Sequence, residues 1–110
     1  AFDLEGTYLG VTKLPAGSLP CDVDFHRGNA VVGCLQGPQG STPAPFYILD
    51  RDGKLVSEVN PKRDFGLDLF THIHNATWKA EVGPEGKIER VYVLATAWNP
   101  GGFAVFELVE

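Results

Sequence analysis

Glycine or proline interrupts this chain every few residues, and the apolar runs between them are short and rich in Val, Ile, Phe and Tyr. Such runs are typical of β-strands, and they are too short to build the 3.6-residue periodicity of an amphipathic helix. We expect eight strands, over residues 7–11, 21–25, 30–35, 46–49, 54–59, 76–82, 91–96 and 103–109. The sequence therefore predicts an all-β fold without long helices.

Glycine-containing turns separate neighbouring strands. Residues 27–29, 50–53 and 83–87 each place glycine between two apolar runs, where a tight turn requires a positive φ. Each of these turns is short enough to reverse the chain between adjacent antiparallel strands. The pattern predicts consecutive hairpins.

The strands also form an internal repeat. Segments 20–25, 30–34 and 46–50 are echoed, in the same order, by segments 73–78, 91–95 and 103–107. A fourth element recurs as well, because Phe2-Asp3-Leu4-Glu5-Gly6-Thr7-Tyr8-Leu9 matches the stretch over 49–56. The second unit has no copy of this fourth strand after its third one, and the spare copy precedes the first unit.

Period and strand order together predict the blades of a β-propeller, each a four-stranded antiparallel meander of ~40–50 residues. We expect two four-stranded blades, over residues 19–60 and 70–110, and a closing strand over 1–12. Propellers commonly close their ring with an N-terminal strand, and here it would complete the last blade of a neighbouring chain. The alternative is one eight-stranded sandwich or barrel with a coincidental repeat.

The same segments resemble a known family. Leu19-Pro20-Cys21-Asp22-Val23-Asp24-Phe25 leads to Ala30-Val31-Val32-Gly33, and His72-Ile73-His74-Asn75-Ala76-Thr77 leads to Val91-Tyr92-Val93 and Trp98-Asn99-Pro100-Gly101-Gly102. A Pro or His before an innermost strand, a Gly-marked turn and an apolar second strand resemble blade openings of NHL-type six-bladed propellers, the group that includes the peptidylglycine amidating lyases. The resemblance covers nearly the whole chain. It implies six blades and a metal held by histidines from alternate blades, here His72 or His74.

Two blades cannot close a propeller, which has typically four to eight. Alone, they would expose two apolar sheet faces wider than a soluble monomer tolerates, with residues such as Phe46, Ile48, Val93, Phe103 and Val105. Cyclic assembly of identical chains would cover both faces and the free sheet edge. We therefore expect a homo-oligomer, preferably a homotrimer with six blades, and dimers or tetramers as other closures. The alternative is a piece of a longer propeller.

Charge and hydropathy argue against two other classes of partner. A formal net charge of -5 without a basic run disfavours nucleic acid and anionic membranes. The longest apolar stretch, around 91–95, is far shorter than the ~20 residues that span a bilayer. No basic-then-apolar leader opens the chain, so we expect any signal peptide to be absent or already removed, and nothing in the sequence indicates a compartment.

His72 and His74 are the candidate metal ligands. Alternation along an expected innermost strand would point both toward the propeller channel, and three chains would gather three copies around one axis. That geometry suits Zn²⁺ or a related divalent ion, and the alternative is a hydrogen bond from each imidazole to backbone. Asp22 and Asp24 share one face of segment 21–25 and could bind Ca²⁺, although such pairs more often have Arg or Lys partners.

Trp98 and Asn99 are the candidate ligand-binding residues. They lie in an expected loop at one end of the ring, where Trp98 could stack on a ligand, and the alternative is packing between blades. Cys21 and Cys34 are expected on adjacent strands, as free buried thiols or alternatively as a cross-strand disulfide. The chain has no Gly-rich phosphate loop, Ser-His-Asp order or Cys-x-x-Cys pair, so common enzyme motifs are absent.

Three functions fit these features. The leading interpretation is a binding or scaffold propeller, assembled as a ring, with an axial site for an ion or small ligand. The second is a metal-dependent lyase or hydrolase of the amidating-lyase type, although no motif identifies the catalytic Tyr and Arg of that family here. The third is a protein-interaction ring without a small-molecule site. Whether the chain is an enzyme is open at this point.

Overall fold

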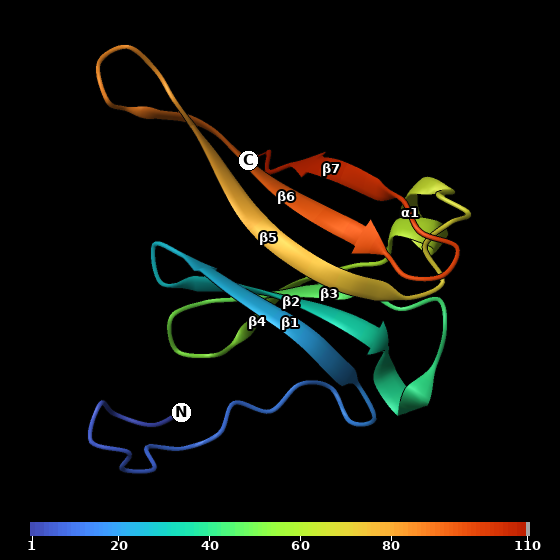
Figure 1. The fold of residues 1–110 in the computed structure, drawn as a ribbon, viewed down its shortest axis with the longest axis horizontal. Coiled ribbons are helices and arrows are strands. Elements are labelled where there is room, and N and C mark those ends of the chain that lie inside the picture. Colours follow the sequence, from blue (N-terminus) through green and yellow to red (C-terminus); the bar gives the residue numbers. More distant parts are fainter. Residues whose placement is uncertain (110) are drawn as a thin grey trace.

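The structure, a computed structural model, describes residues 1–109; Glu110, the last residue of the predicted second blade, lies outside this part. Seven strands joined by tight turns make up most of the chain (Figure 1). They are β1 (Leu19–His26), β2 (Asn29–Gln36), β3 (Phe46–Leu49), β4 (Leu55–Val59), β5 (Ile73–Val82), β6 (Ile88–Ala97) and β7 (Phe103–Glu107). The predicted all-β fold is confirmed, and each of these strands overlaps a predicted one.

The strands form two antiparallel sheets, each a simple meander. The first sheet has the order β1-β2-β3-β4, and the second has the order β5-β6-β7. Every strand pairs with its neighbour along the chain, which is the connectivity that the repeat predicts. A bulge interrupts the register near the start of each first strand, between Pro20 and Asp22 in β1 and between Ile73 and Asn75 in β5.

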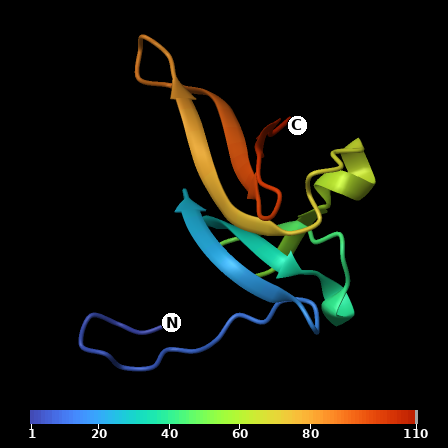
Figure 2. The same ribbon diagram turned by 45° about the vertical axis from the view of Figure 1, so that its right-hand side comes forward.

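The two sheets pack face to face, and the main hydrophobic core lies between them (Figure 2). Its buried members are Val31, Phe46, Phe70, Ile73, Ala76, Val93, Ala95 and Ala97. Phe106 of β7 packs edge-on against Phe46 of β3, with 5.3 Å between the ring centroids. A smaller cluster, which includes Val32 and Tyr47, lies on the opposite face of the first sheet, where Leu14 packs against it.

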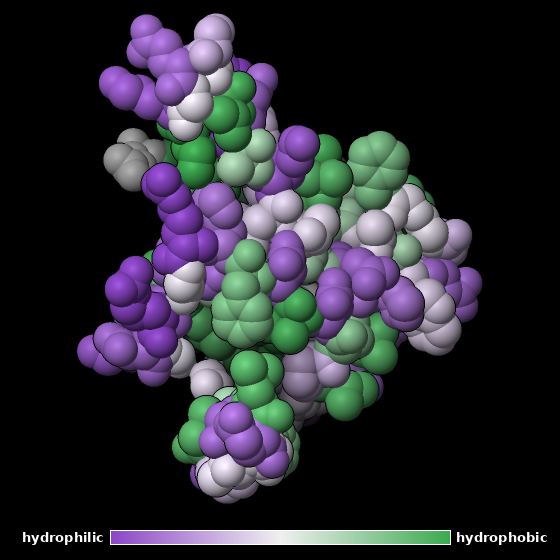
Figure 3. All heavy atoms as spheres, turned by 60° about the vertical axis from the view of Figure 1, so that its left-hand side comes forward, coloured by the Kyte–Doolittle hydropathy of each residue, from purple (hydrophilic) through white to green (hydrophobic). Residues whose placement is uncertain are grey.

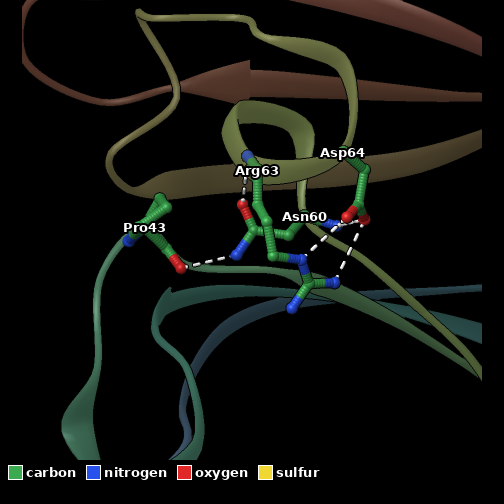
Figure 4. Close-up of polar contacts among 4 residues, drawn as sticks. All are labelled: Pro43, Asn60, Arg63 and Asp64. Carbon is green, nitrogen blue, oxygen red and sulfur yellow. Dashed lines mark hydrogen bonds and ion pairs between the residues drawn. The ribbon is translucent and has the colours of Figure 1, made fainter.

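A five-residue helix, α1 (Pro61–Phe65), follows β4 and was not expected from the sequence. Asn60 caps it: the side-chain oxygen accepts from the Arg63 N–H at 3.1 Å, and the side-chain amide donates to the Pro43 carbonyl at 2.7 Å (Figure 4). Gly66 ends the helix in the left-handed conformation. Within residues 1–109, no helix has the length and apolar character needed to cross a membrane.

The strand expected over 7–11 does not form within the single chain. Residues 1–18 contain one isolated bridge, between Phe2 and Tyr8, and lie on the side of the first sheet that faces away from the second (Figures 1 and 2). Apolar side chains of this segment, such as Leu4, are exposed beside polar ones in the lobe at the bottom of Figure 3. The prediction is wrong for an isolated chain because no strand in residues 1–109 pairs with the segment.

Candidate functional site

Two aspartates of β1 hold the sheets together along the edges formed by β1 and β5. Asp22 accepts from the backbone N–H of Ala76 at 3.1 Å, and Asp24 accepts from the backbone N–H of Trp78 at 2.8 Å. Asp24 also accepts from the Thr77 hydroxyl at 2.6 Å. Because β5 is an edge strand in the described chain, these carboxylates occupy the place of a neighbouring strand. We call this set of contacts the carboxylate seam.

The carboxylate seam corrects the expectation for the aspartates. Backbone amides, the Thr77 hydroxyl and the Asn75 side-chain amide, rather than Arg or Lys, are their partners in residues 1–109. The hydrogen bond from the Thr77 hydroxyl, followed by the one from the Trp78 amide, lowers the pKa of Asp24. The predicted alternation in β1 is confirmed, but the aspartates face the second sheet, while Val23 and Phe25 face away from it.

The strand registers make the two sheets equivalent position by position. Gly33 lies opposite Asp22 in the first sheet, and Thr96 lies opposite Asn75 in the second, in each case next to the bulge. Counting along the strands from these pairs identifies, for each residue of the first sheet, the residue at the same position in the second sheet. The residues of β2 and β3 that face the second sheet across the core are Val31, Phe46 and Ile48. Their counterparts in β6 and β7 are Leu94, Phe103 and Val105.

Equivalent residues differ sharply in exposure. The side chain of Phe46 is 1% exposed because the second sheet covers it, whereas Phe103 is 72% exposed and Val105 is 52% exposed. Nothing in residues 1–109 covers these two side chains to a comparable extent. We call the surface formed by Leu94, Phe103 and Val105 the forward face.

The first sheet has the complementary surface. Val23 and Phe25 of β1 are exposed, and by the same register they correspond to Ala76 and Trp78, which pack against the first sheet. A cleft of about 270 Å³ adjoins them, lined also by Leu14 and by residues of β2 and β3. We call the surface of Val23, Phe25, Ala30, Val32 and Leu49 the rear face. The second sheet thus has one uncovered face, the forward face, and the rear face of the first sheet is uncovered at Val23 and Phe25, while Leu14 packs against its buried residues.

A second cleft, of about 320 Å³, lies between the outer strands of the two sheets. Its walls are mainly apolar and include Ile48, Val59 and Phe106. The indole N–H of Trp78, which also lines this cleft, is buried without a hydrogen-bond partner in the described chain. The cleft adjoins β7, the edge of a three-stranded sheet whose counterpart has β4 as its fourth strand. We call it the outer cleft.

His72 and His74 lie at the start of β5 in different environments. His72 is half-buried, and its Nδ1 donates to the Leu35 carbonyl at 2.7 Å, whereas His74 is exposed and its Nδ1 bonds to the Asn75 side-chain oxygen at 2.9 Å. The bulge after Ile73 breaks the alternation that would point both imidazoles the same way. No cluster of three His, Cys, Asp or Glu side chains within residues 1–109 is arranged for a metal.

Trp98 and Asn99 lie in the loop between β6 and β7. The Trp98 ring stands edge-on to the His72 ring at 6.0 Å between centroids, and the Trp98 N–H donates to the His72 carbonyl at 3.3 Å. Trp98 is 52% exposed, and Asn99 is exposed with a positive φ of 43°. The structure thus brings two predicted site residues together, and we call Trp98 and His72 the aromatic corner.

Cys21 and Cys34 are both free, so the predicted thiols are confirmed, although Cys21 is exposed. Burial raises the pKa of Cys34 to about 12. The Cys21 sulfur lies 2.9 Å and 3.0 Å from the carbonyl oxygens of Ile73 and His74, and its single proton is donated to one of them at a time. Although the residue is exposed overall, desolvation of this sulfur, followed by the nearby Asp22, raises the pKa of Cys21. Neither cysteine is therefore primed as a nucleophile at neutral pH.

No family model, no curated protein and no solved structure matches this chain. The likeness to NHL-type propellers accordingly depends on the sequence patterns quoted above. The carboxylate seam was missed from the sequence because an aspartate beside an edge strand has no signature beyond alternation. The exposure expected from the repeat is confirmed for Phe103 and Val105 and is wrong for Phe46 and Val93, because the two sheets of the chain bury these side chains between them.

Proposed function

We propose that the chain is a two-blade unit of a β-propeller ring that assembles head to tail from identical chains and acts as a binding or scaffold module. The observation that carries this proposal is the pair of uncovered faces. Within the chain, the face of Phe46 and Ile48 packs on the second sheet, and the forward face repeats that surface. The forward face of one chain can therefore pack on the rear face of the next in the same way. Apolar patches of this kind usually mark interfaces.

A head-to-tail interface closes into a ring when the rotation that relates one chain to the next is a whole-number fraction of a full turn. Three chains would give six blades, the number in the family that the sequence resembles. The ring would repeat the aromatic corner once per chain at one end. Such threefold repetition suits an ion or a symmetric contact better than an asymmetric substrate, which supports a binding role over a catalytic one.

Light scattering on the purified chain is expected to give three times the chain mass of 11.9 kDa. Arginine in place of Val105 on the forward face should reduce this mass to that of a single chain, because a charge would be buried without a partner. Val82 is a matched control because its side chain is 58% exposed at the end of β5, away from the forward face and the rear face. Val82→Arg should leave the mass unchanged. A wild-type chain that stays monomeric at micromolar concentration would refute the ring.

The axial ion is a second element of the proposal, and His74 is its preferred ligand because it is exposed at the start of β5. Protein purified without chelator is expected to contain about one divalent ion per three chains by elemental analysis. The ion should be lost in His74→Ala and on acidification, because only the neutral imidazole binds a metal. His72→Ala tests the alternative ligand.

Two results together would remove the ion from the proposal. They are the absence of metal in the protein as purified and an unchanged melting temperature of wild type and His74→Ala on addition of Zn²⁺. The metal-dependent lyase or hydrolase alternative would lose its support with the ion. An interaction ring without a small-molecule site would remain.

A further inference from the structure

The turn between β3 and β4 has a distinctive set of local hydrogen bonds. The Asp50 side chain accepts from the N–H groups of Asp52 and Lys54, both at 2.9 Å. The Asp50 N–H donates to the Lys54 carbonyl at 2.9 Å, and the Gly53 N–H donates to the Asp50 carbonyl at 3.0 Å. Gly53 has a φ of 79°. These bonds close the hairpin in which Leu55 lies opposite Leu49.

The N-terminal segment has the same set of bonds at equivalent positions. The Asp3 side chain accepts from the N–H groups of Glu5 and Thr7, at 3.0 Å and 2.7 Å. The Asp3 N–H donates to the Thr7 carbonyl at 3.0 Å, and the Gly6 N–H donates to the Asp3 carbonyl at 3.1 Å. Gly6 has a φ of 84°. The segment is therefore folded as the turn that leads into a fourth blade strand.

The isolated bridge extends this equivalence. Phe2 pairs with Tyr8 as Leu49 pairs with Leu55. Residues 8–12 thus correspond to β4, but no strand in residues 1–109 pairs with them beyond the bridge. The second sheet has the opposite deficit, because β7 is its edge within residues 1–109. The described chain thus contains a segment equivalent to a fourth strand without a sheet and a sheet with three strands.

We infer that residues 8–12 of a second copy of this chain add to β7 as the fourth strand of the second sheet. The inference rests on the proposed ring and specifies how its chains join. A second copy is required because the N-terminal segment and β7 lie on opposite sides of the first sheet (Figures 1 and 2). Strand addition pairs the free backbone groups of an exposed edge and is a common mode of recognition.

The β3–β4 pairing fixes the register. Tyr47 lies opposite Glu58 in the first sheet, and their counterparts are Ala104 of β7 and Val11 of the N-terminal segment. Val11 of one copy therefore lies opposite Ala104 of the other. The same register places Tyr8 opposite Phe106, which lines the outer cleft, so that Phe106 of the other copy would replace Phe2 as the partner of Tyr8. Tyr8 and Val11, both exposed in the single chain, would fill apolar space there.

Strand addition and face packing belong to one continuous surface. Leu14, which follows the segment directly, packs on the cluster that includes Val32 of the rear face. When residues 8–12 of one copy pair with β7 of a neighbour, the rear face of that copy is therefore placed on the neighbour's forward face. This continuity favours a second copy over an unrelated peptide as the occupant of the edge.

A paired-cysteine experiment tests the register. Val11→Cys and Ala104→Cys are combined in the full-length chain with Cys21→Ser, which removes the exposed native thiol and leaves the buried Cys34. Mild oxidation with oxidised glutathione should link chains covalently, up to closed trimers on a non-reducing gel. The matched control is Leu9→Cys with Ala104→Cys, two residues out of register. It should give about ten-fold less product because its Cβ atoms would be too far apart.

Hydrogen exchange on the wild-type chain tests the same strand pairing without any substitution. Amides of residues 9–12 and 103–107 should exchange at least ~10-fold more slowly in the assembly than at dilutions where the chain is single. Preferred linkage of Val11→Cys with Ala104→Cys, together with this protection, would support the inference. Equal or absent linkage and fast exchange in a protein of ring mass would overturn strand addition but leave the ring. A monomeric mass would overturn both.

Discussion

Phe46→Ala is expected to lower the free energy of unfolding by about 3–5 kcal/mol. Phe46 is 1% exposed between the sheets, and its ring packs edge-on against Phe106. Removing the ring leaves a cavity bordered by residues of both sheets. The backbone hydrogen bonds within each sheet restrict the movement of the strands into this cavity. Urea denaturation followed by circular dichroism measures the loss. A cost below about 1 kcal/mol would contradict the packing of the two sheets.

Phe103→Ala is the matched control because Phe103 occupies the equivalent position on the forward face. In a single chain the substitution should cost less than about 0.5 kcal/mol, since the side chain is 72% exposed. In the ring the forward face is covered, so the cost should approach that of Phe46→Ala and depend on protein concentration. A small cost at every concentration would argue against the ring while leaving the fold intact.

Asp24→Ala is expected to lower the free energy of unfolding by about 2 kcal/mol at neutral pH. The variant loses three hydrogen bonds to a carboxylate, from the Phe25 N–H, the Thr77 hydroxyl and the Trp78 N–H, and leaves the Trp78 N–H without its acceptor in the described chain. Asp68→Ala is the control, because Asp68 is exposed and makes no side-chain hydrogen bond within residues 1–109. Equal stabilities of the two variants would show that the carboxylate seam contributes little.

A second substitution at this position, Asp24→Asn, should change the pH dependence of unfolding. The pKa of Asp24 in the folded chain lies below its ordinary value of 3.8, so the unfolded chain binds the proton more readily. The stabilisation by Asp24 is therefore complete above that ordinary value and is lost as the pH falls through the folded pKa. The stability difference between wild type and Asp24→Asn should shrink over this range. A constant difference from pH 7 to about pH 2 would contradict the assigned partners.

The strands could be predicted from the sequence because each is a short apolar run bounded by turn residues. Helix α1 could not be predicted by periodicity, since five residues complete little more than one turn. Its boundary signals were nevertheless present as Asn60, Pro61 and Gly66, which favour the cap, the first helical position and the left-handed end. Helices this short have to be predicted from the residues at their ends rather than from periodicity.

The site was harder to predict than the fold because its geometry depends on contacts between distant residues. The expectation that His72 and His74 share a direction assumed strict alternation, and the bulge after Ile73 removes that assumption. The contact between His72 and Trp98 joins residues from two loops, which no local pattern indicates. The match between stretches 2–9 and 49–56, in contrast, did indicate the duplicated turn.

The carboxylate seam has a consequence for how the ring would come apart. Asp22 and Asp24 correspond by register to Asn75 and Thr77 of β5, whose side chains already donate to these two aspartates within the chain. Joints inside a chain thus use charged acceptors, whereas joints between chains would have no acidic pair at the equivalent positions and would be neutral and weaker there. The two kinds alternate around the circle. Mechanical or chemical stress would open the neutral joints first, releasing intact blade pairs that are free to exchange between rings.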